Sequence, residues 1–423
     1  MSEEIIRIMG NGTLSGEVCV SGAKNSALKL MAAAILGQGT SVIRNVPKIS
    51  DINIMSQVLE CLGATVARDG HALTIDTSAV DKFETPYYLV SKMRASISVL
   101  GPLIGRFGRA HVAMPGGCQI GARKIDMHLA GLQALGVEFS VEHGVLVAEA
   151  ANGLHGATVE LEFPSVGATE NLLMAAVVAS GKTVIENAAR EPEIVDLANM
   201  LNEMGARVSG AGSSIIEVEG VELASMHPCD HATVGDRIEA GTFLAGGALT
   251  GGPLKVRGID PSYLSMAIMK LREMGCTVST GEDWIEVARA GKLSAVDIQT
   301  LPHPGFPTDL QAQFMLLCAL AQGTSVITEN VFENRFMFAA ELMRMGASIA
   351  IEDHHAFVYG VEGLEGAPVS STDLRAGAAL VLAGIVAEGE TRVYEIKHID
   401  RGYEDYVGKL RALGADVERI VEE

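Results

Sequence analysis

One cysteine in this sequence has neighbours that would make its thiol reactive. Cys118 lies in the loop sequence MPGGCQIGARK, which carries three glycines, between the basic residues Arg109 and Arg123. Nearby positive charge lowers the pKa of a thiol, so that the group becomes an acid or a nucleophile near neutral pH. An exposed loop cysteine without a role is the plainer alternative. Cys61 and Cys318 differ from Cys118, because they lie within helical patterns typical of a core.

Charged residues recur where strongly apolar helical runs begin. The residues at these starts are Lys24, Arg94, the segment 165–170 (SVGATE), Asp236 with Arg237, Asp309, and Asp373 with Arg375. An acidic residue there is ordinary capping and stabilises the positive end of the helix dipole by about 0.3–1 kcal/mol. A Lys or Arg there opposes the dipole, so several of them at equivalent places predict a bound anion. The alternative is that each base pairs with a nearby carboxylate in a solvated rim.

Three further arginines, Arg123, Arg335 and Arg401, stand at the starts of amphipathic helices. The chain has 52 acidic residues against 32 Lys plus Arg, a formal charge of -20. In so acidic a chain, bases gathered at helix starts indicate a ligand with several negative charges, with phosphates and carboxylates both fitting. The same net charge repels phosphate backbones at long range, so nucleic acid is not expected as a partner.

A repeated unit must position these residues, because a Gly after an apolar pair opens a strand at regular intervals along the chain. These glycines are separated by 68 to 73 residues: Gly63, Gly136, Gly205, Gly275, Gly346 and Gly414. In each repeat the sequence predicts an apolar helix, a strand, an amphipathic helix and a hairpin, in the order α-β-α-β-β. The apolar helices are expected inside, with the sheets wrapped round them. The six repeats divide into two domains of three repeats each, with the boundary expected near residues 225–235.

The remaining patterns exclude several classes of protein. The longest apolar runs have about a dozen residues, short of the roughly twenty that cross a bilayer. The N-terminus lacks the basic and then apolar pattern of an export signal, so we expect a cytoplasmic protein without membrane insertion. The six cysteines show no metal-type spacing, and the segment 227–231 (HPCDH) is interpreted as a polar linker and not as a metal site. Neither a metal nor a cofactor is expected, and the oligomeric state stays open.

Seven motifs that contain these residues closely resemble the UDP-N-acetylglucosamine enolpyruvyl transferases (1-carboxyvinyltransferases). They are GAKN (22–25), KMRAS (92–96), PGGCQIGAR (115–123), FPTDLQAQF (306–314), VFENRF (331–336), DLRAG (373–377) and HIDRGYE (398–404). The likeness runs from about Ile6 to Val421. It implies an α/β protein (α+β by some schemes) of two inside-out, barrel-like domains with three repeats each. The first domain would be 23–232 and would carry the Cys118 loop, the second 1–22 plus 233–423, and the active site would lie in the cleft between them.

The resemblance also implies an activity. Such enzymes transfer the enolpyruvyl group of phosphoenolpyruvate to the 3'-hydroxyl of UDP-N-acetylglucosamine with release of phosphate, the first committed step of peptidoglycan precursor synthesis. The hydroxyl adds to C2 while C3 is protonated, and phosphate then leaves as C3 is deprotonated. Cys118 matches the general acid to C3, which the antibiotic fosfomycin alkylates, and Asp309 matches the carboxylate near the attacking hydroxyl.

The family likeness assigns binding roles as well. Lys24, Arg123 and Arg401 resemble the clamp on the phosphate, and Arg335 and Arg375 complete the positive pocket. The residues that fall where the family contacts the nucleotide sugar are Asn25, Arg94, Arg123, Lys124, Ile125, Asp126, Met127, Ser165, Val166, Gly167, Asp309 and Val331. The Cys118 loop would close over both substrates.

Two departures from the family pattern affect the nucleotide-sugar site. Lys124 stands where many members have Pro, and Phe163 with Pro164 precedes Ser165 where some relatives have a lysine. Three rival functions remain. A transferase of the same fold that acts on shikimate 3-phosphate lacks the cysteine loop. A non-catalytic paralogue would not need Cys118 and Asp309, and the acidic balance of the chain opposes a clamp around nucleic acid.

Overall fold

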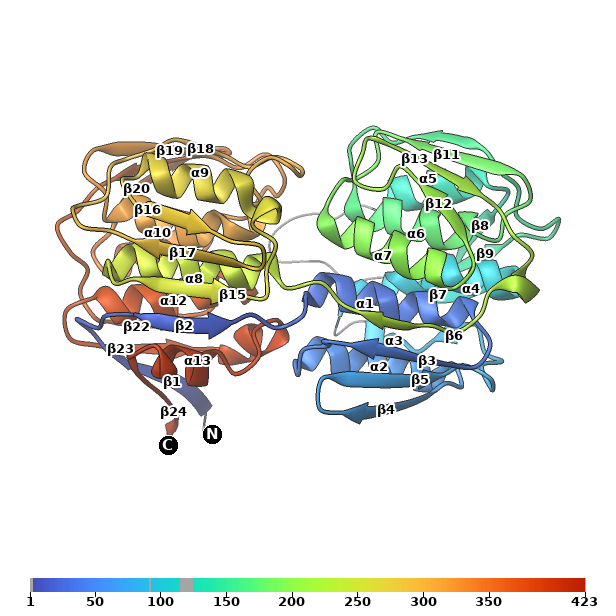
Figure 1. Ribbon diagram of the computed structural model, residues 1–423, viewed down its shortest axis with the longest axis horizontal. Coiled ribbons are helices and arrows are strands. Elements are labelled where there is room, and N and C mark those ends of the chain that lie inside the picture. The colour runs from blue at the N-terminus through green and yellow to red at the C-terminus, as the bar shows by residue number, and fades with distance from the viewer. Residues whose placement is uncertain (1–2, 91–92, 115–124, 423) are drawn as a thin grey trace. The chain divides into compact units, whose positions relative to one another are not determined.

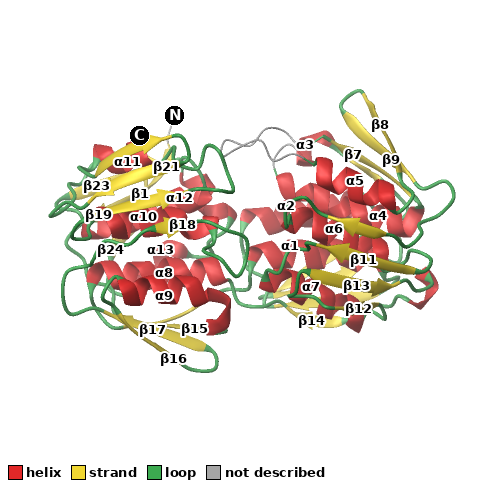
Figure 2. Cartoon of the chain, turned by 90° about the horizontal axis from the view of Figure 1, so that it is seen from above, coloured by secondary structure: helices red, strands yellow, loops and turns green. Residues whose placement is uncertain are grey.

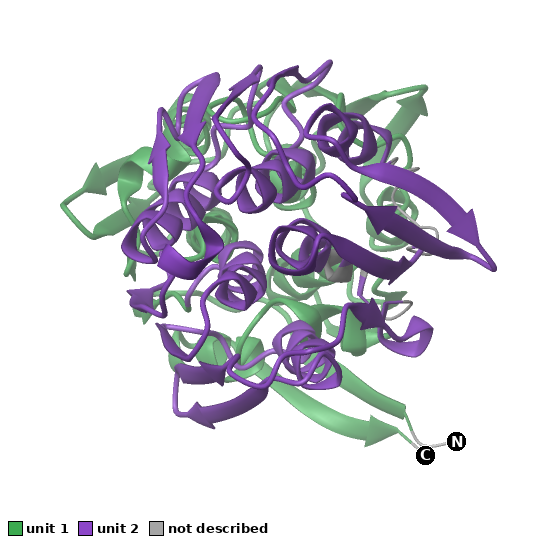
Figure 3. Ribbon diagram, turned by 90° about the vertical axis from the view of Figure 1, so that its right-hand side faces the viewer, with its two compact units in different colours: residues 1–21, 118–122, 235–423 green, residues 22–117, 123–234 purple. Residues whose placement is uncertain are grey.

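A computed structural model describes residues 3–90, 93–114 and 125–422. The chain forms two compact units, shown in Figure 3. Of the described residues, unit 1 contains those up to Ser21 and from Gly235 onward, and unit 2 contains those from Gly22 to Val234. Each unit has its own hydrophobic core.

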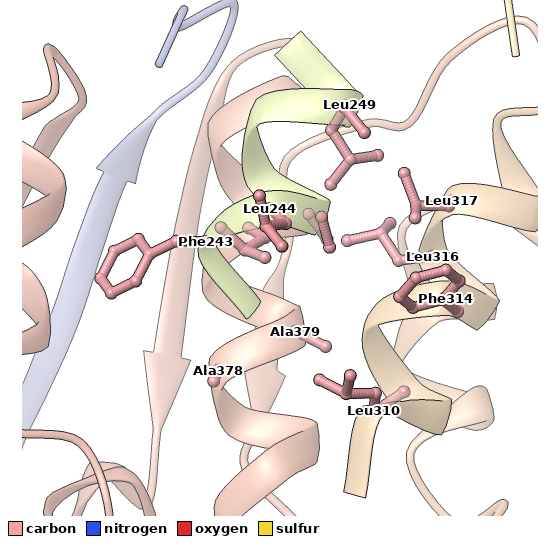
Figure 4. Close-up of a cluster of buried hydrophobic side chains, with 14 of the residues drawn as sticks. Phe243, Leu244, Leu249, Leu310, Phe314, Leu316, Leu317, Ala378 and Ala379 are labelled. Carbon is pink, nitrogen blue, oxygen red and sulfur yellow. The ribbon is translucent and has the colours of Figure 1, made fainter. Parts of the chain in front are cut away.

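Apolar helices fill the interior of each unit. In the described chain they are α1 (Lys24–Ala33), α4 (Leu100–Phe107) and α6 (Val166–Ala176) in unit 2, and α8 (Arg237–Thr250), α10 (Gln311–Ala319) and α12 (Leu374–Val386) in unit 1. A helix that is apolar on all sides must be buried, and every residue of α10 is. In Figure 4, Leu244 of α8, Leu316 of α10 and Ala379 of α12 converge on one cluster. None of the described helices is both long and apolar enough to cross a membrane.

Sheets cover these helices on the outside, as Figure 2 shows for each unit. In the described part of the chain there are six sheets of four strands. In unit 2 their orders are β14(Asp230–Ala232)-β3(Thr40–Arg44)-β5(Ala72–Asp76)-β4(Thr65–Asp69), β6(Glu84–Thr85)-β7(Arg109–Ala113)-β9(Val145–Glu149)-β8(Glu138–Glu142) and β10(Thr158–Glu160)-β11(Lys182–Glu186)-β13(Ile215–Glu219)-β12(Arg207–Ser209). The predicted α/β architecture, with helices inside and sheets outside, is therefore confirmed.

Unit 1 has the same sheet pattern, with two strands supplied by residues 3–19. Its orders are β16(Thr277–Thr280)-β17(Trp284–Ala288)-β15(Leu254–Arg257)-β2(Gly16–Cys19), β18(Ile298–Gln299)-β19(Thr324–Thr328)-β21(His355–Tyr359)-β20(Ser348–Glu352) and β22(Pro368–Ser370)-β23(Glu390–Tyr394)-β1(Glu3–Met9)-β24(Asp416–Glu422). Strand β1 lies antiparallel between β23 and β24, where Ile6 is opposite Val393 and Arg419. It takes the place that the last strand of the repeat fills in the other five sheets.

The repeat contains one strand that its sequence pattern did not predict. Each inner helix is preceded by a strand of two to four residues that pairs in parallel with the first long strand of a sheet. So short a strand shows no alternation of apolar and polar residues, which is the signal for a strand in a sequence. Two of these strands belong to a different unit from the helix that follows them. Strand β2 pairs with β15 of unit 1 but precedes α1 of unit 2, and β14 pairs with β3 of unit 2 but precedes α8 of unit 1.

A second helix in each repeat is amphipathic and ends at a glycine, as predicted. These helices are α2 (Ser50–Cys61), α5 (Asp126–Ala134), α7 (Pro192–Glu203), α9 (Ser265–Glu273), α11 (Ala339–Arg344) and α13 (Tyr406–Ala412). Helix α11 is labelled in Figure 2 and the other five in Figure 1. The glycines that follow them, from Gly63 to Gly414, have φ values of 95–106°. Glycine adopts this conformation without steric cost, so it ends the helix and turns the chain into the next strand.

The remaining helices are short. They are α3 (Tyr87–Val90) and the 310 helices η1 (Ala34–Leu36), η2 (Arg94–Val99), η3 (Leu223–Ser225), η4 (Pro261–Leu264), η5 (Thr308–Leu310) and η6 (Ile396–Arg401). Three of the 310 helices bear on the candidate site, because η2 and η5 lead directly into the inner helices α4 and α10, and η6 ends at Arg401.

A buried histidine fixes the segment that leads out of unit 2. His231 of β14 is 7% exposed, and its Nε2 and Nδ1 atoms lie 2.9 Å from carboxylate oxygens of Asp196 and Glu203 on α7. The second Asp196 oxygen accepts hydrogen bonds from the Ser26 hydroxyl of α1 and from the Val234 backbone N–H. His231 is therefore a structural residue and not part of a solvated linker.

We expect this histidine to make the stability of unit 2 depend on pH. Burial lowers the pKa of His231, but hydrogen bonds and charge from Asp196 and Glu203 outweigh burial, so the pKa lies above its usual value. The stabilisation is fully present below the unfolded pKa of about 6.5 and is lost as pH rises through the folded pKa. In urea unfolding from pH 5.5 to 8.5, we expect wild type to lose more stability with rising pH than His231→Gln. The control His155→Gln removes an exposed imidazole and should keep the wild-type slope. Equal slopes for wild type and His231→Gln would contradict the expectation.

Candidate active site

Asp309 lies between two buried arginines in unit 1. It is the middle residue of η5, just before the inner helix α10. Its Oδ1 accepts a hydrogen bond from Arg335 Nη2 at 2.9 Å, and its Oδ2 accepts one from Arg375 Nε at 3.4 Å. The two arginine side chains are 3% exposed, whereas that of Asp309 is 25% exposed. Two cations therefore surround one accessible carboxylate, and the trio has a net positive charge.

Arg375 stands at the start of an inner helix, where its charge opposes the helix dipole. Asp373 caps the same helix by accepting a hydrogen bond from the backbone N–H of Arg375 at 2.9 Å. Burial would lower the pKa of Arg375, but Tyr403, Asp309 and Asp236 outweigh it and hold the pKa above its usual value. The Nη1 atom of Arg375 is buried and has no hydrogen-bond partner among the described residues. A charged donor in this position is suited to an anionic ligand.

A buried polar network supports Arg375 from behind. The guanidinium carbon of Arg375 lies 5.3 Å from the ring centre of Tyr403, on whose face the cation is attracted. The Tyr403 hydroxyl is 2.8 Å from Thr242 Oγ1, and Gln313 Nε2 donates to Thr242 Oγ1 at 3.0 Å and to Tyr403 at 3.3 Å. Thr242 in turn donates to the Ile238 carbonyl at 2.8 Å. The network joins all three inner helices of unit 1.

One buried carboxylate holds the loops on either side of Asp309. Glu329 is 3% exposed, and its Oε1 accepts hydrogen bonds from Thr300 Oγ1 and from the Val331 backbone N–H, both at 2.9 Å. Its Oε2 accepts one from Thr308 Oγ1 at 2.9 Å. Glu329 therefore fixes both Val331 and the residue next to Asp309.

In unit 2, Lys24 begins α1 and is paired with a carboxylate. Its Nζ atom lies 2.7 Å from Asp51 Oδ2, and the two residues are 8% and 1% exposed. Asn25 beside it is partly exposed. Further along α1, Lys29 Nζ lies 3.0 Å from Glu170 Oε2 of α6, and burial raises the pKa of Glu170 to about 7 in spite of this lysine. Lys24 and Arg375, at the starts of α1 and α12, do pair with carboxylates, but both bases are buried and do not form a solvated rim.

The starts of α5 and α6 lie close together in unit 2. Ser165 caps α6, since its Oγ accepts a hydrogen bond from the Ala168 backbone N–H at 3.3 Å. Gly167 packs so closely on His128 of α5 that a Cβ atom on the glycine would lie 2.9 Å from the imidazole Cε1. Two segments predicted to bind the nucleotide sugar, 125–127 and 165–167, therefore lie side by side.

The predicted site residues are divided between the two units. Unit 1 holds Asp309, Val331, Arg335, Arg375 and Arg401, of which Arg401 ends η6 and is partly buried. Unit 2 holds Lys24, Asn25, Arg94, Ile125, Asp126, Met127, Ser165, Val166 and Gly167. The backbone of Arg94 begins η2. The predicted residues Cys118, Arg123 and Lys124 lie outside the described residues.

The buried residues that contact these site residues were not predicted from the sequence. They are Asp51, Thr242, Gln313, Glu329 and Tyr403. A signal for two of them was present, because Thr242 and Gln313 are polar residues inside helical runs that are otherwise apolar. Such residues need hydrogen-bond partners once they are buried.

The arrangement in unit 1 is suited to proton transfer beside an anion. An accessible carboxylate flanked by fixed cations can accept a proton while the cations stabilise negative charge nearby, without reorganising at the moment of reaction. Among the described residues, no group of three or more His, Cys, Asp or Glu side chains is arranged so that it could hold a metal ion.

Comparisons with known proteins agree with one another. The family described as EPSP synthase (3-phosphoshikimate 1-carboxyvinyltransferase) matches residues 8–410. A UDP-N-acetylglucosamine 1-carboxyvinyltransferase of Shewanella amazonensis is 50% identical over 416 residues, which cover 98% of this chain and 99% of that protein. UDP-N-acetylglucosamine 1-carboxyvinyltransferase 1 of Staphylococcus aureus is 52% identical over 418 residues, again 98% and 99% of the two chains. The Mycolicibacterium paratuberculosis enzyme of the same name is 51% identical over 420 residues, 99% and 100% of the two chains.

Solved structures show the same fold. The enolpyruvyl transferase NikO from Streptomyces tendae superposes with a TM-score of 0.89 at 29% identity, over 100% of both chains. An EPSP synthase from Acinetobacter baumannii gives a TM-score of 0.75 at 16% identity over 100% of both chains, which shows a likeness of fold alone. The chain therefore belongs to the EPSP synthase family of enolpyruvyl transferases and, within it, to the UDP-N-acetylglucosamine 1-carboxyvinyltransferases.

Proposed function

We propose that this chain transfers the enolpyruvyl group of phosphoenolpyruvate to the 3'-hydroxyl of UDP-N-acetylglucosamine and releases inorganic phosphate, in the first committed step of peptidoglycan precursor synthesis. The bridge from Asp309 to Arg335 and Arg375 is the observation that carries the proposal. It offers an accessible carboxylate that can accept the proton of a hydroxyl group, and fixed cations that can bind an anionic substrate. The names of relatives about 50% identical over nearly the whole chain support the choice of substrates.

Asp309 is the proposed general base of the addition step. The sugar hydroxyl forms a bond to C2 of phosphoenolpyruvate, its proton passes to the carboxylate, and C3 gains a proton from an acid. Arg335 and Arg375 hold the Asp309 carboxylate in one orientation, in which it would accept the proton of the hydroxyl. Elimination then breaks the bond from C2 to the phosphate oxygen, and C3 loses a proton to restore the double bond.

Cys118 is the proposed acid toward C3, on the basis of its glycine-rich loop and flanking bases. Lys24, Arg123 and Arg401 are proposed to clamp the phosphate, and Arg335 and Arg375 to complete the positive pocket. The buried Asp51 would orient Lys24 within this clamp. Since predicted substrate contacts come from both units, we propose that both domains, 23–232 and 1–22 plus 233–423, contribute residues to the active site.

The nucleotide sugar is proposed to bind at the helix starts of unit 2. Ser165, Val166 and Gly167 begin α6, and the adjacent segment 125–127 begins α5. Backbone N–H groups at helix starts suit a diphosphate. Asn25, Arg94, Arg123, Lys124, Asp309 and Val331 would complete these contacts. Lys124, in place of the proline of many relatives, would offer the nucleotide a charge contact.

The first test is phosphate release from phosphoenolpyruvate with two acceptors. We expect release with UDP-N-acetylglucosamine and none with shikimate 3-phosphate. Release with shikimate 3-phosphate alone would move the chain to the other branch of its family. Release with neither acceptor would favour a non-catalytic paralogue that binds the nucleotide sugar.

Cys118→Ser tests the proposed acid. A hydroxyl is a far weaker acid than a thiol, and loss of general acid catalysis costs about 10²–10⁴-fold in rate. We expect kcat to fall by this amount, while Cys61→Ser in helix α2 keeps wild-type turnover. Intact-mass measurement after incubation with fosfomycin should show one adduct on wild type and on Cys61→Ser but none on Cys118→Ser. Full activity in Cys118→Ser would remove its assigned role.

Asp309→Asn tests the proposed base. The amide keeps the size of the side chain but accepts no proton, so we expect kcat to fall about 10²–10⁴-fold. Asp297→Asn is the matched control in the same unit, since Asp297 also accepts a hydrogen bond, from the Val326 backbone N–H at 2.8 Å, but at an exposed site. Both variants are compared by steady-state phosphate release. A loss of the same size in both variants would contradict a catalytic role for Asp309.

A further inference from the structure

We propose that Asn171 is a positioning residue for the nucleotide-sugar site, because its side-chain amide bonds together the three helical segments whose starts would bind this substrate. The inference rests on the proposed function. It concerns a residue of unit 2 that contributes no predicted substrate contact of its own.

Asn171 is a polar residue in an apolar helix. It is the sixth residue of α6, is 0% exposed and is followed by the buried pair Leu172 and Leu173. Burying an amide without hydrogen bonds is costly, so a buried Asn is stable only where its hydrogen bonds are made. The packing around Asn171 provides partners for both ends of the amide.

The hydrogen bonds of this amide have one consistent assignment. Asn171 Oδ1 accepts from the Gly101 backbone N–H at 2.8 Å. Because a backbone N–H can only donate, this bond identifies the oxygen, and Nδ2 must be the donor on the other side. Nδ2 donates to the Ile97 carbonyl at 3.3 Å and lies 3.0 Å from His128 Nδ1, which therefore accepts. His128 is then the neutral imidazole with its proton on Nε2.

Each partner belongs to a different part of the proposed substrate surface. Ile97 and Gly101 lie in η2 and α4, the continuous helical segment that begins at Arg94. His128 is the third residue of α5 and directly follows the segment 125–127. Asn171 itself belongs to α6, the helix that begins after Ser165. One side chain is thus bonded to both of the other helical segments.

The helices around this amide approach one another closely. A Cβ atom on Gly101 would lie 2.4 Å from the Asn171 carbonyl oxygen, and a Cβ atom on Gly167 would lie 2.9 Å from His128 Cε1. Helices α4 and α5 therefore both approach α6 at glycines. The glycines permit the close approach, and the amide determines where along α6 each partner sits.

Loss of the amide has a defined consequence for substrate binding. Without it, the Ile97 carbonyl, the Gly101 N–H and His128 Nδ1 lose a buried partner, and the three helix starts are free to shift. Displacement by about 1 Å of groups that position a substrate is enough to cost on the order of a hundredfold in rate. Among the described residues proposed to bind phosphoenolpyruvate, Lys24 lies on α1, and Arg335, Arg375 and Arg401 lie in unit 1. None of them is bonded to the Asn171 amide, so phosphoenolpyruvate binding should change much less.

The test compares Asn171→Ala with Asn202→Ala. Asn202 of α7 also bonds to backbone with both ends of its amide, donating to the Val208 carbonyl at 2.9 Å and accepting from the Val208 N–H at 2.7 Å, but within one exposed turn. In steady-state phosphate release, we expect Asn171→Ala to raise KM for UDP-N-acetylglucosamine at least about tenfold, with KM for phosphoenolpyruvate within about twofold of wild type. Asn202→Ala should leave both values within about twofold.

His128→Phe removes the acceptor while keeping a ring at the same place, and covers the case in which Asn171→Ala does not fold. It should also raise KM for UDP-N-acetylglucosamine selectively, and the melting temperature of each variant separates this effect from a general loss of stability. Unchanged or equally raised KM values in folded, active variants overturn the role of Asn171 and leave the proposed function standing. A wild type that releases no phosphate overturns the proposed function and this inference with it.

Discussion

Three apolar helices fill the interior of each unit. Because these helices are buried, they restrict the positions at which the protein can carry charged side chains. A helix such as α10, with every residue buried, can carry an ionised group only at its ends or in a pair. Asp309, Arg375 and Lys24 all stand at the starts of inner helices, and each has an oppositely charged partner. The sheets outside then close each core, while the helix starts remain the polar ends of the two interiors. The architecture that buries the hydrophobic residues also collects the candidate catalytic groups.

Much of this architecture follows from patterns that the sequence displays openly. The glycines from Gly63 to Gly414 end one helix per repeat, and they have the positive φ values that explain their recurrence. The apolar runs that begin at Lys24 and Asp309 form inner helices, and the fold class is confirmed. The strands β6 and β18 were not predicted, because a strand of two residues is too short to show the alternation of apolar and polar residues that indicates a strand. The pairing of β2 with β15 and of β14 with β3 joins distant parts of the chain, which local patterns do not encode. The expected domains 1–22 plus 233–423 and 23–232, which contain β2 and β14 respectively, came from the family resemblance.

The candidate site shows a similar division. Motifs identified Asp309, Arg335 and Arg375, which the structure brings together, whereas the roles of Cys118, Arg123 and Lys124 stay predictions. The residues that escaped prediction act through others: Glu329 holds two loops, Tyr403 supports a guanidinium group, and Asn171 joins three helical segments. A buried polar residue within an apolar run indicates that a partner exists. Only the packing identifies that partner, since it comes from a helix far away in the sequence.

The place of β1 has a consequence for how the protein is made. Its partners β23 and β24 are the last long strands of the chain, and Arg7 is paired in register with Arg392 and Glu418. During synthesis this first strand leaves the ribosome with neither neighbour available, while unit 2, continuous from Gly22 to Val234 in its described part, has all its strands long before. Unit 2 can thus fold first, and the sheet of unit 1 is completed only when β23 and β24 have been made and pair with β1. A ribosome that stops early therefore leaves a folded unit 2 attached to an apolar strand with an exposed edge, the kind of surface that chaperones must shield.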